Sequence, residues 1–177
     1  MGRFWICGAI LTGMLGGGRG EAAGMRLELR EGWAIQTSAS VKEGGEAVSR
    51  RGFPTAGWHR ATVPTTVVAA LVADSTFPDP HYGTNLRTFP GVSYKVGTNF
   101  SNVEMPADST FAAPWWYRTE LDLPQEAEGK ALWLRLDGVN FRFDAWLNGK
   151  KIADAAQTAG AFRVHELDVT GIAKSGR

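Results

Sequence analysis

The chain has 177 residues, of which 44% are hydrophobic, and its formal net charge is +1. A chain of this length can bury the core of one domain, and a nearly neutral chain lacks the basic patch that nucleic acid or an anionic membrane surface attracts. The composition therefore predicts a globular domain without a nucleic-acid partner.

Residues 1–23 have the pattern of a secretory signal peptide, with a basic start at Arg3, an apolar run at 4–15 and small residues near a possible cleavage site. The run is short for a membrane span, so we expect a secreted or periplasmic protein with no membrane anchor after cleavage. An uncleaved anchor and a mis-called start codon are the alternatives. Cys7 is the only cysteine. The processed domain, residues 24–177, would then have neither disulfides nor thiol chemistry, and it would carry 17 basic and 17 acidic residues.

Short strands and one helix are expected next. The strand-like pieces are residues 27–29, 33–36 and 57–63, with a glycine-rich, charged stretch at 42–51 between them. Apolar residues at helical spacing between Val67 and Val72 predict a short helix, which Thr65 or Thr66 can cap and which ends by Asp74. A helix this short must be docked on a sheet.

Residues 74–114 form a long irregular segment with five prolines and several aromatic residues. The prolines prevent long strands, while the aromatic content argues against a solvated linker. Long loops inside compact domains are usually functional, so we expect ligand contacts here. The densest polar cluster runs from Asp79 to Asn85 and includes Tyr82. The alternative is a turn in which Asp79 and Asn85 satisfy local backbone groups.

The rest of the chain alternates apolar and polar residues with a period of two, which predicts strands with one buried face. These strands are residues 115–123, 132–137, 141–148 and 161–167. Asn148-Gly149 predicts a hairpin to residues 151–153, since both residues tolerate positive φ. Closely spaced strands of this kind predict an all-β jelly-roll sandwich with one short helix and one long irregular loop.

Other features limit the chemistry. The chain contains 7 tryptophans, and Trp115 and Trp116 can either line a sugar pocket or pack the core. The three histidines are isolated from one another and from cysteine, so no metal-ligand spacing is present. We therefore expect no metal and no cofactor in this chain.

Six short motifs follow one another in an order that resembles glycoside hydrolase family 2. They are Val63-Pro64-Thr65-Thr66-Val67, Asp79-Pro80-His81-Tyr82-Gly83-Thr84-Asn85-Leu86, Trp115-Trp116-Tyr117-Arg118, Asp137-Gly138-Val139-Asn140, Trp146-Leu147-Asn148-Gly149 and Gly160-Ala161-Phe162-Arg163. Within that family, residues 30–170 resemble the N-terminal galactose-binding-like jelly roll of exo-β-D-glucosaminidases and β-mannosidases.

The resemblance implies a sugar-binding domain whose catalytic acids lie elsewhere. In the family, an acid pair sits on a TIM barrel of about 250 residues that follows the jelly roll and an immunoglobulin-like domain. The resemblance also implies a further strand after Thr170, which would leave this jelly roll truncated at its C-terminus. By position, Asn85 is the best candidate for contacting the terminal sugar of a β-linked oligosaccharide, with Asp79 and Tyr82 as its neighbours. An autonomous lectin-like module and a structural remnant without binding are the alternatives.

Overall fold

The computed structural model describes residues 4–5, 10–14, 25–89 and 105–173. Its strands are β1 (Phe4–Trp5), β2 (Ile10–Met14), β3 (Arg26–Glu28), β4 (Trp33–Thr37), β5 (His59–Ala61), β6 (Trp115–Arg118), β7 (Ala131–Leu136), β8 (Phe143–Leu147), β9 (Lys150–Ala153) and β10 (His165–Asp168). The helices are α1 (Gly45–Val48), α2 (Val67–Ala73) and the 3₁₀ turns η1 (Asn85–Thr88) and η3 (Gln125–Ala127).

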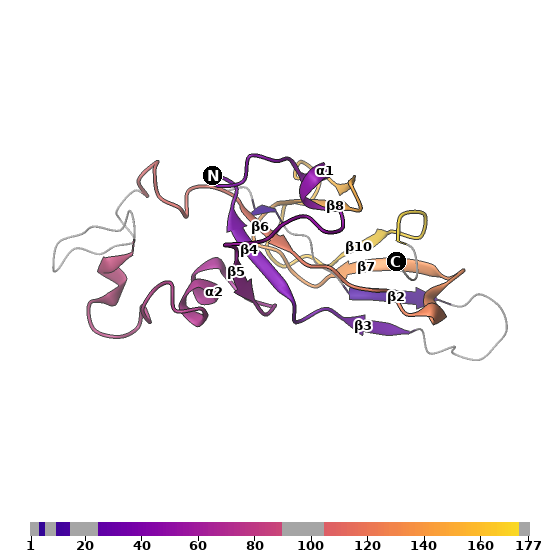
Figure 1. Ribbon diagram of the computed structural model, residues 1–177, viewed down its shortest axis with the longest axis horizontal. Helices are drawn as coiled ribbons and strands as arrows, with labels where there is room; N and C mark the ends of the chain where they lie inside the picture. The colour runs from indigo at the N-terminus through magenta and orange to yellow at the C-terminus, as the bar shows by residue number, and fades with distance from the viewer. Residues whose placement is uncertain (1–3, 6–9, 15–24, 90–104, 174–177) are drawn as a thin grey trace.

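The strands form small sheets in the orders β1-β8-β9, β10-β7-β2-β3 and β5-β4-β6. In Figure 1 the sheet of β4, β5 and β6 lies in the middle of the molecule, α2 lies to its left, and β2, β3, β7 and β10 lie to its right. This mainly stranded arrangement confirms the predicted all-β sandwich.

The β5-β4-β6 sheet is built around a core that α2 covers. Trp33 and Ile35 of β4 are buried, as is Leu71 of α2. Thr66 caps α2 as predicted, because its Oγ1 accepts a hydrogen bond of 3.1 Å from the backbone N–H of Ala69. The helix also stops where expected, with Asp74 as its C-cap.

Two local predictions in this region are wrong. The prediction of a single helix missed α1, which forms inside the charged stretch 42–51 because Val48 docks into the interior with 1% exposure. The prediction of one buried face for residues 115–123 is also wrong, since all of β6 is buried and the strand ends at Arg118. The second face of β6 is covered by Trp146, whose ring centroid lies 5.5 Å from that of Trp116.

The hairpin predicted at Asn148-Gly149 is confirmed, with φ values of 50° and 84° that connect β8 to β9. The strand predicted at 161–167 begins only at His165. Before it, Phe162 is fully exposed, because Gly160 turns the chain at a φ of 133° and donates its N–H to the carbonyl of Phe141.

The N-terminal segment contributes strands to the fold. β1 pairs with β8, and β2 pairs with both β7 and β3. β7 therefore has a neighbour on each side, β10 and β2. Cys7 lies outside the described residues, and the processing of residues 1–23 stays a prediction. Within the described part of the chain, no helix combines the length and apolar character needed to cross a membrane.

Candidate functional site

The predicted ligand loop is held closed at its base by aromatic packing. Phe77 and Phe89 stack with their ring centroids 4.6 Å apart, and Phe111 lies 6.0 Å from Phe77 and 6.3 Å from Phe89. The N–H of Phe77 also donates to the carbonyl of Leu71 in α2. Residues 78–88 thus form a compact loop whose two ends meet at the core, a geometry that is frequently functional.

Hydrogen bonds organise the interior of this loop. The Asp79 carboxylate accepts a 2.9 Å hydrogen bond from the backbone N–H of His81, and its Oδ1 lies 3.0 Å from His81 Nδ1. That backbone bond and the contact with the ring hold the pKa of Asp79 below its usual value. The amide of Asn85 donates to the carbonyl of Asp79 at 3.0 Å. The structure therefore brings Asp79 and Asn85 together.

The loop has the hydrogen bonds of a turn in which Asp79 and Asn85 satisfy local backbone groups. Tyr82 is 77% exposed at its tip. An Asn side chain has two N–H donors and an acceptor oxygen, so Asn85 retains capacity for a ligand hydroxyl after its bond to Asp79. Asp79 is the single carboxyl group among residues 78–88. Retaining glycoside hydrolysis needs two carboxyl groups about 5 Å apart, so this loop alone has no such pair.

The predicted tryptophans lie inside the protein. Trp115 is 2% exposed and donates its indole N–H to the carbonyl of Thr110 at 3.0 Å. Trp116 is 5% exposed and packs on Trp146. Neither ring has a free face for a sugar, so their positions agree with the packing alternative. Their influence on a ligand would act through the support they give to neighbouring segments.

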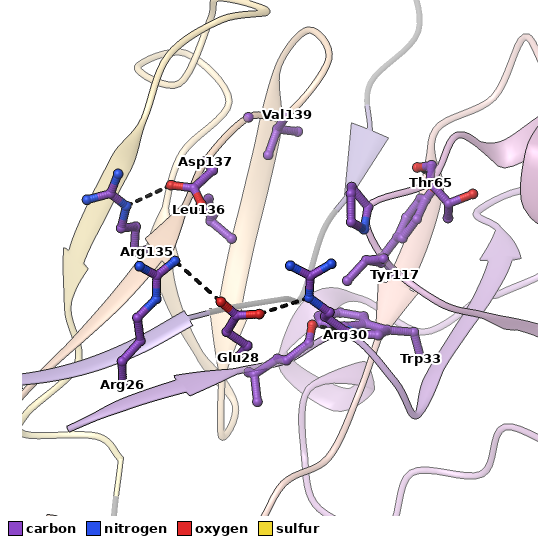
Figure 2. Close-up of a pocket in the computed structure, with 14 residues that line it drawn as sticks. Arg26, Glu28, Arg30, Trp33, Thr65, Tyr117, Arg135, Leu136, Asp137 and Val139 are labelled. Carbon is purple, nitrogen blue, oxygen red and sulfur yellow. Dashed lines mark hydrogen bonds and ion pairs between the residues drawn. The ribbon is translucent and has the colours of Figure 1, made fainter.

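A pocket of about 320 Å³ lies away from this loop. It is lined by Arg26, Glu28, Leu29, Arg30, Trp33, Val63, Pro64, Thr65, Tyr117, Arg135, Leu136, Asp137, Gly138 and Val139, which Figure 2 draws. None of the five predicted site residues is among them. Because the walls come from segments far apart in the chain, no local sequence pattern marks this pocket.

The rim of the pocket carries charges that are already paired. Glu28 lies between Arg30, at 2.9 Å, and Arg26, at 3.7 Å (Figure 2). The hydrogen bond from Arg30 lowers the pKa of Glu28. On the other wall, Arg135 contacts Asp137 at 2.7 Å and Glu166 at 3.3 Å. The rim therefore offers little unpaired charge to a ligand.

The floor of the pocket is apolar. Trp33 and Tyr117 contribute to it although they are only 2% and 5% exposed. Burial raises the pKa of Tyr117 to about 12. Rings this deeply buried expose no face on which a sugar could stack.

In the part of the chain that the structure describes, no three His, Cys, Asp or Glu residues are grouped so as to hold a metal ion.

Two other polar residues, Asp144 and Asn148, stabilise the backbone around them. Asp144 is 3% exposed and accepts from the N–H of Ala155 and from Lys151 Nζ. Asn148 donates to the carbonyl of Ile172 at 3.2 Å.

Comparisons with known proteins agree on one family. Residues 33–177 match the family model described as glycosyl hydrolase 2 galactose-binding domain-like. The chain is 34% identical over 157 residues to an exo-β-D-glucosaminidase of Amycolatopsis orientalis, a match that covers 89% of this chain and 13% of that protein. It is 35% identical over 145 residues to an exo-β-D-glucosaminidase of Streptomyces avermitilis, covering 82% of this chain and 14% of that protein.

A solved structure gives the same answer. The crystal structure of the Amycolatopsis orientalis exo-chitosanase CsxA superposes with a TM-score of 0.65 at 36% identity, covering 82% of this chain and 15% of that chain. The match thus spans a small fraction of each of these longer relatives. Since the family model covers most of the sequence and the fold agrees, the chain belongs to the galactose-binding domain-like family of glycosyl hydrolase 2.

Proposed function

We propose that this chain is the non-catalytic sugar-binding domain of a secreted, retaining exo-acting glycoside hydrolase, and that Asp79, Tyr82 and Asn85 help to shape its pocket for the terminal sugar. The observation that carries the proposal is the loop closed by Phe77 and Phe89, which holds Asp79 and Asn85 together at the surface. A recognition loop needs such a rigid base, because a ligand gains most from groups that are already positioned.

The relatives and the carboxylate of Asp79 support a proposal for the substrate class. The two relatives named above are exo-β-D-glucosaminidases, which favours β-linked glucosamine over mannose. Glucosamine carries an ammonium group, and a carboxylate with a lowered pKa such as Asp79 is a suitable partner for it. The acid pair and the barrel that holds it would lie in the other domains of the longer protein, as in the family.

Export is part of the proposal and is supported by the signal-like pattern of residues 1–23. It is tested by expressing the chain with its natural start in a secreting host and sequencing the N-terminus of the exported protein. Cleavage near Ala23 is expected. Retention of residue 1 in an exported protein would contradict this part of the proposal and would leave the sugar-binding part intact.

Sugar recognition is tested in a chimera that carries residues 33–177 in place of the matching region of the Amycolatopsis orientalis relative. In this chimera Asn85→Ala should raise KM for an aryl β-D-glucosaminide about tenfold, because losing one hydrogen bond to substrate costs about 1.4 kcal/mol. The matched control is Thr84→Ala, since Thr84 is exposed and its side chain makes no cap hydrogen bond. Equal KM values for the two variants would contradict the proposal.

A further inference from the structure

The outward face of strands β7 and β10 carries an exposed tryptophan. Leu132, Leu134 and Leu136 of β7 are buried, whereas Trp133 between them is 37% exposed. Successive side chains of a strand point to opposite faces, so Trp133 lies on the outside of the sheet while the leucines build the core. Among the tryptophans whose side chains the structure describes, Trp133 is the most exposed.

A carboxylate lies directly beside this ring. Asp168 of β10 is the cross-strand partner of Trp133, and Figure 1 shows the two strands side by side. Residues paired in this way place their side chains on the same face, with Cβ atoms about 5 Å apart. The hydroxyl and the backbone N–H of Thr170 lower the pKa of Asp168 by hydrogen bonding to its carboxylate. Asp168 is therefore ionised at neutral pH.

The nearest cation on this face does not neutralise Asp168. Arg135, the next outward residue of β7, contacts Asp137 at 2.7 Å and Glu166 at 3.3 Å, so two carboxylates already share its charge. Within the described part of the chain, Asp168 bonds to Thr170 and makes no ion pair. The surface around Trp133 thus combines an open aromatic ring with an excess of negative charge.

We propose that Trp133 and Asp168 form a second sugar subsite, on the outer face of the sheet, for one unit of a β-linked glucosamine oligomer. The occupant follows from charge complementarity, because such an oligomer carries an ammonium group on each unit and is a polycation. The subsite lies apart from the 79–85 loop, which follows α2 on the opposite side of the central sheet in Figure 1. This inference rests on the substrate class proposed above and not on the contacts proposed for the loop.

The two groups act on the same ammonium in different ways. An exposed ion pair such as Asp168 with an ammonium group is screened by water and salt and contributes little alone. A cation over an indole ring is attracted by the negative face of the ring, and tryptophan is the best aromatic partner. Because both groups lie side by side, one sugar unit can use both. The subsite holds a distant part of a long substrate and takes no part in its cleavage.

The first test compares a long and a short substrate in the chimera that carries residues 33–177. Trp133→Thr keeps a residue suited to a strand and should raise KM for a glucosamine polymer about fivefold. Asp168→Asn should raise it about threefold at low salt and have no effect at high salt. Both variants should leave kcat and KM for an aryl β-D-glucosaminide unchanged. The matched control is Asp122→Asn, which alters an exposed carboxylate paired with Arg51 at 3.1 Å and should change neither substrate.

The second test measures binding to the full chain. A glucosamine oligomer is titrated in slightly acidic buffer, and the indole N–H resonance of Trp133, assigned with Trp133→Phe, is followed by NMR. The resonance should shift in a saturable manner. The N-acetylated oligomer, which has no ammonium groups, should bind more weakly, and Asp168→Asn should remove most of this preference.

The contrary results are distinct. An unchanged polymer KM in Trp133→Thr, or an equal rise of KM for both substrates, would refute the subsite. Equal binding of the two oligomers would refute recognition of the ammonium group by Asp168. A chimera without activity on either substrate would contradict the proposed function, whereas the titration of the full chain would still decide the subsite.

Discussion

Gly45 occupies a position where the structure leaves no room for a side chain. A Cβ added there would lie 2.2 Å from two ring atoms of Trp146 and 2.7 Å from a third. The indole cannot easily retreat, since it packs against Trp116 on one side and lies 5.5 Å from Lys151 Nζ. The substitution Gly45→Ala should therefore push α1 away from β8.

The expected change in the free energy of unfolding of Gly45→Ala combines two opposing contributions. Overpacking of this kind costs about 1–3 kcal/mol. Replacing Gly by Ala in a helix recovers about 1 kcal/mol, since Ala restricts the unfolded chain and favours the helix. Because the 2.2 Å contact involves a rigid ring, we place the cost at the upper end and expect a net loss of about 2 kcal/mol. For a chain of this size, this lowers Tm by about 4–8 °C.

The matched control is Gly44→Ala, next to Gly45 in the sequence. Gly44 has nothing within 4 Å of an added Cβ, and its φ of −80° and ψ of 170° suit alanine. Thermal unfolding followed by circular dichroism should show Gly44→Ala within about 0.5 kcal/mol of the parent. Equal Tm values for the Gly45→Ala and Gly44→Ala variants would refute the packing of α1 against Trp146.

Three further predictions concern the core and the loop. Arg118→Met should destabilise the fold by about 1–3 kcal/mol in urea unfolding, because it leaves the buried carbonyl of Val48 without its 2.9 Å hydrogen bond from the guanidinium. An effect below about 0.5 kcal/mol would contradict this. Because burial raises its pKa to about 12, Tyr117 should form phenolate only near pH 12. The free energy of folding that the neutral phenol contributes should therefore be complete below pH 10 and lost as the pH rises through 12. Phenolate absorbance at alkaline pH checks this, and Tyr117→Phe should remove the absorbance change near pH 12. Phe77→Ala should speed amide hydrogen exchange in residues 78–88, because it removes the aromatic stack with Phe89. Unchanged exchange rates would contradict the claim that this stack holds the two ends of the loop together.

Local sequence patterns were sufficient to predict β7, the β8–β9 hairpin and the N-terminal cap of α2. The period-two pattern located β7, and Asn148-Gly149 located the β8–β9 hairpin, because side-chain alternation and turn conformation depend on neighbouring residues. The cap of α2 was predictable for the same reason, since Thr66 and Ala69 are three residues apart.

Contacts between distant segments account for what the sequence did not reveal. The burial of both faces of β6 depends on Trp146, and α1 depends on the same side chain. The pocket joins β3 to β7 across about a hundred residues of sequence, so no spacing rule could find it. In the loop, the sequence analysis predicted that Asp79 and Asn85 are neighbours, and the structure places them within hydrogen-bond distance. The stacking of Phe77 on Phe89, which closes the loop, was not predicted from the sequence.

The most direct test of sugar contact by the loop is a double-substitution cycle in the chimera, measuring kcat/KM of the parent and of Asn85→Ala with an aryl β-D-glucosaminide and its 3-, 4- and 6-deoxy forms. If Asn85 bonds one hydroxyl, its replacement should matter little for the substrate lacking that hydroxyl, which gives a coupling of about 1 kcal/mol. An effect of Asn85→Ala that is the same for every substrate would contradict direct contact with the sugar.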